Sequence, residues 1–166
     1  MDTGKLILDI VNAKFGDSII ETSDFRDDLC ITVKKEYIIS LGKFLKEDPQ
    51  LQFIMCKDVT AIDWATRKNR FTTVYHIYSF LLNYTLRLKS NIDIDPPAID
   101  SITSVWNSAD WYERETFDMY GIKFINHPDL RRIYMPEGFE YYPLRKEFPV
   151  LGIPGSLPLP NKDEIL

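Results

Sequence analysis

Apolar side chains recur at helical spacing near the start of the chain. Between Lys5 and Phe15 they lie three or four positions apart, and Gly16 follows as a stop signal. The run Leu29 to Lys34 alternates between apolar and polar positions as a strand does. Helical spacing returns from Lys35 to Lys46, before Asp48-Pro49 ends it. The N-terminal part of the chain therefore predicts a helix, a strand and a second helix.

Three β-rich runs follow. They span Gln52 to Asp63, Phe71 to Leu82 and Tyr84 to Asn91. β-Branched and aromatic residues are enriched in strands, and the polar segment Thr66 to Arg70 between the first two runs is typical of a turn. The three runs predict an antiparallel meander.

Two helices are predicted after the break at Pro96-Pro97. The first is short, and the second runs to Tyr120 with Gly121 as its stop signal. The candidate capping residues are Asp100 or Ser101 for the first helix and Asn107 or Ser108 for the second. Beyond Gly121 the chain is punctuated by prolines and predicted to be extended.

These elements predict an α+β fold with a single domain. A mostly antiparallel sheet flanked by helices is expected in residues 1–125, followed by an extended, partner-binding segment over residues 126–166. Proline at the frequency of the last part favours a polyproline conformation without internal hydrogen bonds. The aliphatic side chains of that tail then need a neighbour to cover them, namely Leu151, Ile153, Leu157 and Leu159.

Composition narrows the range of functions. The 166 residues are 45% hydrophobic and 13% aromatic, which is enough to fill one core. With 20 basic and 25 acidic side chains the net charge is -5, which disfavours nucleic acid and anionic lipid as partners. Cys30 and Cys56 lack the close pairing of metal or iron–sulfur ligands, so we expect reduced, buried thiols in a cytosolic compartment. No apolar run approaches the roughly 20 residues that cross a bilayer, and the start of the sequence is unlike a signal or transit peptide.

The segment from Trp106 to Phe148 is the most unusual part of the sequence. Aromatic residues, acids, arginines and prolines alternate there too densely for an ordinary core helix or strand. Such a segment can bury some rings and still present charges and aromatic edges outward. This composition is typical of a surface that binds another protein.

The charges of the predicted second helix have two interpretations. Its apolar face is expected to pack inward, while Asp110, Arg114 and Asp118 face solvent or a partner. Arg114 and Asp118 are four apart and can pair, and acids near the helix start suit its dipole, which favours a structural role. Glu113, Glu115 and Asp118 could instead act as acid/base carboxylates with His127 nearby. Their spacing does not share a narrow helix face, so this alternative is geometrically poor.

The remaining polar candidates also favour structural roles. His76 is predicted to lie on a half-buried strand, and His127, which precedes Pro128, is predicted to fix its own loop by hydrogen bonds. Arg131-Arg132 and Arg145-Lys146 lie next to apolar and aromatic residues. They could tie the chain to its own acids or contact a partner, and the sequence leaves both open. No phosphate loop or nucleophile-plus-base pattern is found.

Four motifs in order resemble one protein family. They are Trp111-Tyr112-Glu113-Arg114-Glu115, Phe117-Asp118-Met119-Tyr120-Gly121, Asn126-His127-Pro128-Asp129-Leu130-Arg131-Arg132-Ile133 and Pro143-Leu144-Arg145-Lys146-Glu147-Phe148-Pro149. Together with Asp63-Trp64 and the strand after it, they resemble the C subunit, or thirty-kilodalton subunit, of respiratory complex I, the proton-translocating NADH:quinone oxidoreductase. The resemblance covers roughly Ala61 to Pro149. It departs at Tyr141-Tyr142, where a Gly-His pair is expected.

The resemblance implies a non-catalytic structural subunit of the peripheral, hydrophilic arm. Such a chain binds no cofactor, although the assembled complex uses FMN, iron–sulfur clusters, NADH and quinone. It packs on the D subunit, also called the forty-nine-kilodalton subunit, and on other arm subunits. It supports the quinone-site geometry and lies on the cytoplasmic face of the bacterial inner membrane. The residues expected at the interface or in its supporting motifs are Trp111, Glu113, Arg114, Glu115, Asp118, His127, Pro128, Asp129, Arg131, Arg132, Tyr141, Tyr142, Pro143, Leu144, Arg145, Lys146 and Phe148.

Two other functions compete with this one. The equivalent small subunit of a related membrane-bound hydrogenase, or of a ferredoxin- or cofactor-linked dehydrogenase, would share the fold. A free-standing hydrolase using Glu115, Asp118 and His127 is the remote alternative. The full Pro-Leu-Arg-Lys motif at Pro143 to Lys146 favours complex I.

Overall fold

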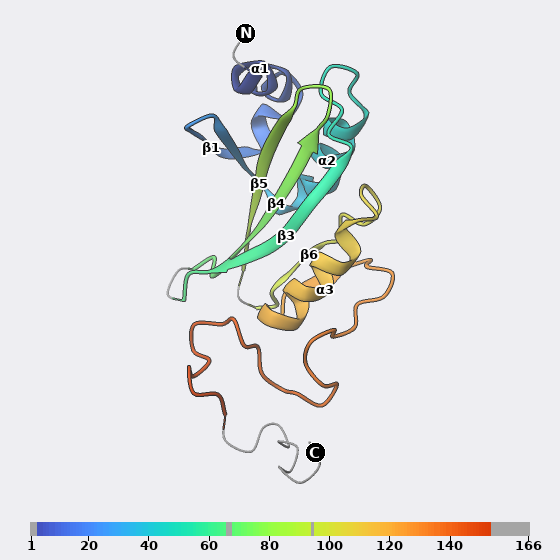
Figure 1. Cartoon of the computed structure of the whole chain (residues 1–166). Coiled ribbons are helices and arrows are strands. Elements are labelled where there is room, and N and C mark those ends of the chain that lie inside the picture. Colours follow the sequence, from blue (N-terminus) through green and yellow to red (C-terminus); the bar gives the residue numbers. More distant parts are fainter. Residues whose placement is uncertain (1–2, 66–67, 94, 154–166) are drawn as a thin grey trace.

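The computed structural model describes residues 3–65, 68–93 and 95–153 (Figure 1). Its helical elements are α1 (Thr3–Phe15), η1 (Gly16–Ser18), η2 (Lys35–Tyr37), α2 (Ile38–Glu47) and α3 (Ala109–Tyr120). Its strands are β1 (Ile19–Phe25), β2 (Asp28–Val33), β3 (Met55–Asp63), β4 (Phe71–Ser79), β5 (Tyr84–Ile92), β6 (Ala98–Asp100) and β7 (Lys123–Ile125). Among the described residues, no helix is both long and apolar enough to span a membrane.

Five strands form the main sheet in the order β1-β2-β5-β4-β3. The predicted meander is confirmed, because β3, β4 and β5 pair antiparallel in sequence order. β1 and β2 form an antiparallel hairpin, and β2 joins the meander by pairing parallel with β5. The short strands β6 and β7 pair parallel in a second sheet. The fold class predicted from the sequence, α+β with a mostly antiparallel sheet, is confirmed.

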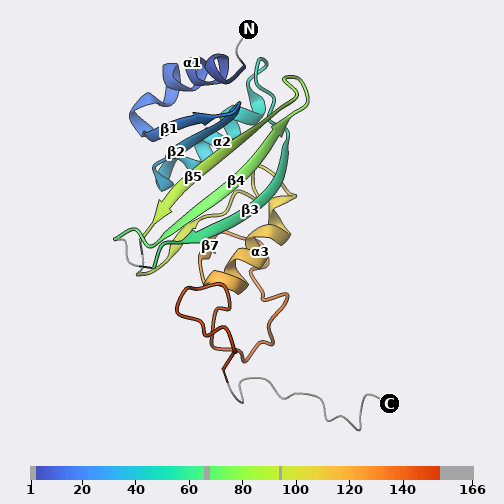
Figure 2. The ribbon, with the colours of Figure 1, turned by 60° about the vertical axis from the view of Figure 1, so that its left-hand side comes forward.

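The core lies between the sheet and the first two helices, and it continues to Ile99 of β6 and Phe124 of β7 (Figures 1 and 2). Ile7 of α1, Leu41 of α2 and Tyr75 of β4 are fully buried members of one apolar cluster. The periodicity that predicted α1 and α2 is therefore the spacing of their buried faces. The opposite face of the sheet carries no helix of the described chain, and α3 lies along the β3 edge in both views.

Hydrogen bonds from α3 and the turn before it cover the β3 edge of the sheet. Three side chains donate to main-chain carbonyl oxygens there: Trp106 Nε1 to Phe53 (2.8 Å), Ser108 Oγ to Cys56 (2.9 Å) and Thr116 Oγ1 to Val59 (3.0 Å). An edge strand otherwise leaves such acceptors unpaired. These bonds fix α3, which carries the candidate site, against the sheet.

Two predictions about individual elements need correction, and strand β1 was missed. The helix expected after Asp100 or Ser101 is absent from this described part of the chain, because residues 98–100 form β6 and turns follow. Ser108 stands at the N-cap of α3, but its hydroxyl bonds to Cys56 and makes no cap hydrogen bond. Gly121 ends α3 in the left-handed conformation, as expected.

The boundaries of other predicted elements shift by a few residues. The helix predicted from Lys35 to Lys46 begins as the η2 turn, and the first predicted β-run becomes a strand only at Met55. The residues before it close the end of α2, where Phe53 N–H donates to Leu45 O at 2.9 Å. Thr66, Arg67, Leu157 and Leu159 lie outside the described residues. Cys30 and Cys56 are free and buried, as predicted.

Candidate interaction surface

Asp118 organises the segment after α3. Its side chain is fully buried, and its Oδ2 accepts hydrogen bonds from the main-chain N–H groups of Ile133 (3.0 Å), Tyr134 (2.7 Å) and Met135 (3.0 Å). Burial alone would raise the pKa of Asp118, but the N–H groups and the Arg132 guanidinium outweigh it and lower the pKa. The carboxylate thus serves as a main-chain anchor for residues 133–135.

Arg132 links this anchor to the aromatic turn at residues 139–142. Its Nη1 lies 2.9 Å from Asp118 Oδ1, and the same guanidinium donates to Tyr141 O. The guanidinium also lies over the rings of Tyr142 and Phe139, 5.1 and 6.0 Å from their centroids. Because the guanidinium binds a carbonyl oxygen of the turn and also stacks on its rings, it holds residues 139–142 in one arrangement.

A second carboxylate holds the end of the described chain. Asp63, at the end of β3, receives both the Nε (2.8 Å) and Nη2 (2.7 Å) atoms of Arg70, together with the main-chain N–H of Lys146 (2.9 Å). Arg70 also pairs with Glu147. Burial opposes the charge of Asp63, but these donors lower its pKa well below its usual range, and the two acids raise that of Arg70. The β3–β4 hairpin is thereby tied to residues 146–147.

Arg145 and Tyr142 close over the end of α3. Arg145 Nε donates to Tyr120 O at 2.6 Å, and its guanidinium lies 4.4 Å from the Tyr142 ring centroid and 5.2 Å from that of Phe71. A Cβ on Gly121 would lie 2.6 Å from both side chains, and Gly121 has a φ of +74°. Glycine is therefore required here both for its backbone conformation and for the close approach. Burial lowers the pKa of Arg145.

Glu113 and His127 form a buried cluster with Ser101. Glu113 is fully buried and accepts hydrogen bonds from Ser101 Oγ (2.6 Å) and Ile102 N–H (2.8 Å). Burial raises its pKa to about 7 despite those two bonds. His127 Nε2 lies 3.9 Å from Glu113 Oε2 and 3.2 Å from the carbonyl oxygen of Asp110.

The expected loop role of His127 is confirmed. Its Nδ1 accepts the main-chain N–H of Asp129 at 3.0 Å, while Nε2 contacts α3. Asp129 in turn forms a two-pronged, exposed pair with Arg131, with both distances 2.7 Å. Pro128, which lies between His127 and Asp129, is exposed. His76 is half-buried on β4, as expected, where it contacts Asp58 and Arg87.

The predicted orientation is wrong for two of the three α3 charges, while Asp110 is half-buried. Asp118 and Arg114 do not face solvent, since 0% and 7% of their respective surfaces are exposed. Instead of pairing with each other, these two residues bind partners in the segment after α3. Arg114 Nε donates to Arg131 O at 3.2 Å and its guanidinium lies over the Trp111 ring, while Asp118 binds Arg132. Glu115 is half-buried on α3.

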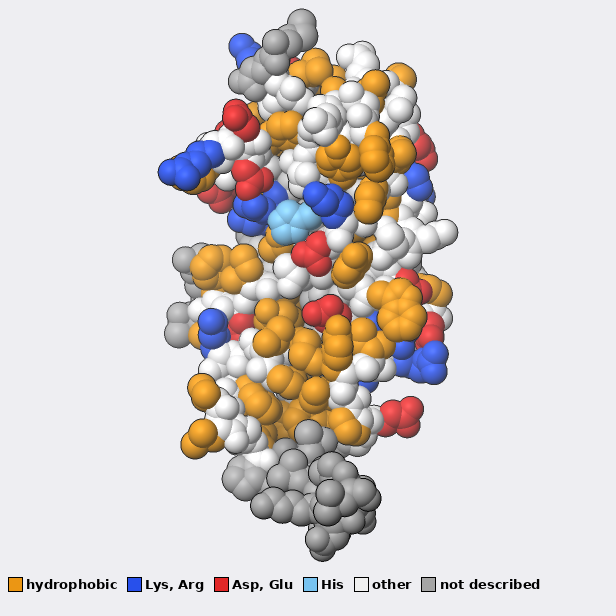
Figure 3. All heavy atoms as spheres, viewed as in Figure 1, with side chains coloured by type: hydrophobic (Ala, Val, Ile, Leu, Met, Phe, Trp, Pro, Cys, Tyr) orange, Lys and Arg blue, Asp and Glu red, His pale blue; other side chains and the backbone are white. Residues whose placement is uncertain are grey.

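With most guanidiniums held inside the chain, aromatic and aliphatic side chains remain outside. The exposed fractions are 63% for Trp111, 61% for Tyr134, 42% for Tyr141 and 50% for Leu144. We call these four residues the C-terminal surface. Figure 3 shows hydrophobic side chains gathered over α3 and the segment that follows it. Exposed apolar side chains gathered in one region can mark a binding site for another protein.

The supporting residues behind this surface pack more deeply. Pro143 and Phe148 are half-buried, and the Phe148 ring lies 6.4 Å from that of Phe139. Leu144 N–H donates to Met119 O at 3.1 Å, so its backbone is fixed while its side chain points outward. A hollow of about 350 Å³ lies beside them, lined by Glu140, Tyr141, Tyr142, Arg145, Glu147, Phe148, Pro149 and Ile153.

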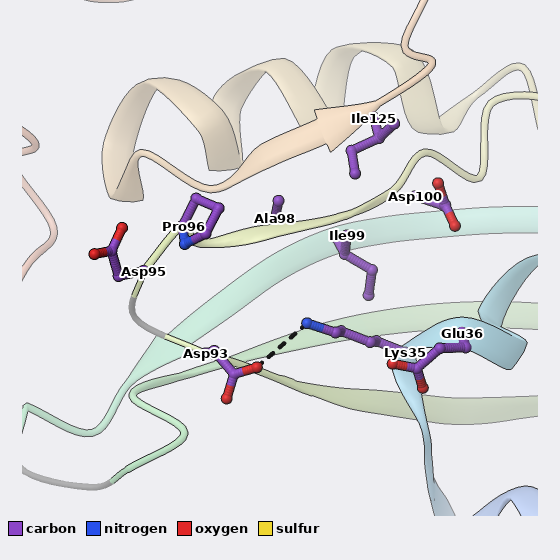
Figure 4. Close-up of a pocket in the computed structure, with 9 residues that line it drawn as sticks. All are labelled: Lys35, Glu36, Asp93, Asp95, Pro96, Ala98, Ile99, Asp100 and Ile125. Carbon is purple, nitrogen blue, oxygen red and sulfur yellow. Dashed lines mark hydrogen bonds and ion pairs between the residues drawn. The ribbon is translucent and has the colours of Figure 1, made fainter.

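A separate hollow lies between η2 and β6 (Figure 4). It measures about 230 Å³, and it is lined by carboxylates and aliphatic side chains, with Lys35 bound to Asp93 at 3.3 Å. In the described part of the chain, no group of three or more His, Cys, Asp or Glu residues has the arrangement of a metal site. The hollow shares no lining residue with the C-terminal surface.

The structure brings most of the predicted site residues together around two anchors that the sequence did not single out as such. Asp63 and Arg70 were missed as members of the site, although the resemblance included Asp63-Trp64. The weak signal for them was a strand that ends in an acid shortly before an arginine. The N–H of Lys146, which Asp63 binds, is 83 residues away in sequence, and no sequence period applies over that separation.

Comparison with known proteins agrees with the resemblance. The family model described as the respiratory-chain NADH dehydrogenase 30 Kd subunit matches residues 31–153. The chain is 44% identical over 144 residues to the C 2 subunit of NADH-quinone oxidoreductase from Rhizobium etli, covering 87% of this chain and 76% of that protein. It is 43% identical over 140 residues to the C subunit of the same enzyme from Geobacter sulfurreducens, covering 84% and 85% respectively.

Two solved structures share the fold. A trypsin-resistant fragment of Nqo5 aligns with a TM-score of 0.66 at 23% identity, covering 78% of this chain and 100% of the fragment. A chain of the membrane-bound sulfane sulfur reductase, an archaeal respiratory membrane complex, aligns with a TM-score of 0.76 at 24% identity, covering 89% and 86%. The family match and the sequence identities show that this chain belongs to the family of the respiratory-chain NADH dehydrogenase 30 Kd subunit.

Proposed function

We propose that this chain is a non-catalytic structural subunit of the peripheral arm of complex I, and that it packs on the D subunit. One observation carries the proposal. The charged side chains of the family motifs anchor the chain to itself, while Trp111, Tyr134, Tyr141 and Leu144 stay exposed. The motifs therefore build a rigid support whose outward face suits a protein partner.

The same arrangement bears on catalysis and cofactors. Asp118 has its carboxylate engaged by main-chain N–H groups and Arg132, and the His127 ring is buried between Asp129 and α3. These groups are committed to holding loops, so we infer that the chain contributes no reaction centre and binds no cofactor. FMN, iron–sulfur clusters, NADH and quinone would belong to the other subunits. The chain would lie on the cytoplasmic face of the bacterial inner membrane, held there by the complex.

The proposed contact is strong enough to matter for assembly. Fully burying one large apolar side chain contributes about 1.5–3 kcal/mol, less the cost of ordering it. The C-terminal surface offers four side chains that are 42–63% exposed, so each can contribute only about half of this value. Because electron transfer depends steeply on distance, loosening this contact would lower activity through loss of assembly and of the quinone-site geometry.

The test is a double variant of the C-terminal surface. Tyr134→Asp with Leu144→Asp puts charge on the proposed contact and leaves both main-chain hydrogen bonds in place. We expect the variant chain to fold but to be lost from the purified complex. The NADH:quinone activity of the complex should be lost with it. The matched control is Leu81→Asp, which is 57% exposed in the turn between β4 and β5. Full co-purification of the double variant, at the level of the control, would refute the proposed contact.

The second candidate is the equivalent subunit of a related membrane complex. It is favoured by the alignment with the sulfane sulfur reductase chain, whose TM-score exceeds that of the Nqo5 fragment. The identities of 44% and 43% to subunits of NADH-quinone oxidoreductase favour complex I instead. Mass spectrometry of the native complex that contains this chain would distinguish the two by their partner subunits. The free-standing hydrolase receives no support, because Asp118 and His127 have structural partners.

A further inference from the structure

The two edges of the main sheet differ. Strand order leaves β1 and β3 at the edges. The β3 edge is covered by α3 through the bonds of Ser108 and Thr116 described above. On β1, the residues that follow Ile19 are all exposed. Figures 1 and 2 show the β1–β2 hairpin projecting at the side of the sheet away from α3.

The hairpin turn determines which backbone groups of β1 point outward. Arg26 and Asp27 have φ values of 55° and 63°, and they join Phe25 to its partner Asp28. A two-residue turn with both φ values positive is a type I′ turn, which is closed by a hydrogen-bonded pair. Because such pairs alternate with non-hydrogen-bonded pairs, the main chain of Asp24 and of Thr22 points away from β2.

An independent contact supports this assignment. Leu29 lies opposite Asp24, and its N–H donates to Tyr84 Oη at 3.2 Å on the β5 side. Leu29 therefore does not bond to β1, as a non-hydrogen-bonded pair requires. Within the described chain, the N–H and C=O groups of Thr22 and Asp24 thus form an open edge that another strand can join.

The side chains of β1 restrict what can pair there. The strand carries Glu21 and Asp24 and no basic residue, while Ile20 is 53% and Phe25 70% exposed. The nearest arginine in sequence, Arg26, lies in the turn over the Phe25 ring. A second copy of the chain that paired parallel and in register would bring acids beside acids, and in any register its β1 would supply no basic residue to Glu21 or Asp24. Like charges on neighbouring strands are destabilising, whereas a strand with lysine or arginine at those positions gains from the same charges.

We propose that the outer edge of β1 accepts an extended, basic strand from a neighbouring protein, which becomes the sixth strand of the main sheet. Main-chain bonds to Thr22 and Asp24 would hold the strand. Basic side chains would meet Glu21 and Asp24, and apolar ones would cover Ile20 and Phe25. This contact, on β1, is separate from the C-terminal surface, whose residues lie on α3 and in the segment after it.

Residue-resolved amide hydrogen exchange tests the proposal. The measurement compares the isolated full-length chain with the purified respiratory complex that contains it. We expect the amides of Thr22 and Asp24 to exchange rapidly in the isolated chain and roughly tenfold more slowly, or slower still, in the complex. Equal exchange in both samples would overturn the proposal. Protection that arises in the isolated chain as its concentration is raised would also overturn it, because a second copy would then be the partner.

Matched variants test the backbone and the charge separately. Thr22→Pro removes one outward N–H and is expected to abolish the protection of the Asp24 amide, whereas Thr22→Val is expected to keep it. Asp24→Lys is expected to reduce the protection of Thr22 more than Asp24→Asn does. Equal protection in the two Asp24 variants would contradict a basic partner. Because these readouts are local to β1, they are independent of co-purification, which reports on the C-terminal surface.

Discussion

Replacing Asp118 by alanine is the sharpest test of how the C-terminal surface is supported. The change removes one acceptor group that serves the N–H groups of residues 133–135 and the Arg132 guanidinium. Within the described chain, those three N–H groups have no second acceptor to replace it. Arg132 keeps its bonds to the Tyr141 carbonyl but loses its charged partner.

The magnitude follows from the kind of bonds that are lost. Hydrogen bonds to a charged group contribute about 1.5–3 kcal/mol each, but bonds that share one acceptor are not additive. Breaking a buried charge pair by removing one partner typically costs about 3–5 kcal/mol. Both Asp118 and Arg132 are largely shielded, so we expect a loss of about 3–5 kcal/mol, expressed first as undocking of residues 131–148.

Denaturant unfolding and limited proteolysis measure the two parts of this effect. We expect a lower unfolding midpoint and new cleavage after Arg131, Arg132 or Arg145 in the Asp118→Ala chain. The matched control is Asp129→Ala, whose ion pair with Arg131 is exposed, and for which we expect unchanged stability. A loss below about 1 kcal/mol with unchanged proteolysis would refute the role of Asp118 as an anchor.

The same reasoning gives the sign of the pH dependence for Asp118. Its pKa is lowered in the folded chain, so its contribution is fully present above the pKa of the unfolded chain, about 3.9. It is lost as the pH falls through the lowered pKa of the folded state. Lowering the pH should therefore reduce the difference in the free energy of unfolding between the wild-type chain and Asp118→Ala.

Two further predictions concern the ends of the same support. Gly121→Ala forces a side chain into contact with Tyr142 at a positive φ, so we expect a loss of about 1–3 kcal/mol, whereas Gly138→Ala, which meets nothing within 4 Å, should change the melting temperature little. For Glu113, the pKa raised to about 7 means that its contribution is fully present below the unfolded pKa and is lost as the pH rises through 7. Glu113→Gln, which stays neutral, should therefore gain stability relative to wild type from pH 5 to pH 8, by up to about 3 kcal/mol; parallel unfolding curves over that range would contradict the assignment.

The elements that were predicted correctly are mainly those in which the spacing of apolar side chains matches the buried face. α1, α2 and the meander have apolar positions at the period of their buried faces, and Gly121 marks the end of α3. β1 was missed because nearly all of it is exposed, so no apolar alternation marks it. That segment is a strand because it pairs with β2. Such pairing depends on two segments together, so the side-chain pattern of one segment alone does not indicate it.

The sequence named Asp118 and many of the residues around it, but it missed Asp63 and Arg70 and gave the wrong orientation for two charges of α3. Helix periodicity placed Arg114 and Asp118 toward water or a partner, because charged residues are rarely fully buried. They are buried because the segment after α3 returns over them and supplies N–H donors and a guanidinium. Those partners come from irregular chain, which has no period, and their positions depend on the tertiary fold.

The need to satisfy irregular backbone explains why buried acids support the C-terminal surface. Residues 126–153 include no strand or helix, so their N–H groups cannot pair in a ladder. Asp118 takes three of these N–H groups and Asp63 takes that of Lys146, while arginines bond to both acids. Carboxylates used in this way resemble catalytic groups in sequence, yet their oxygens are occupied. The rings they hold in place are what remains available to a neighbouring subunit.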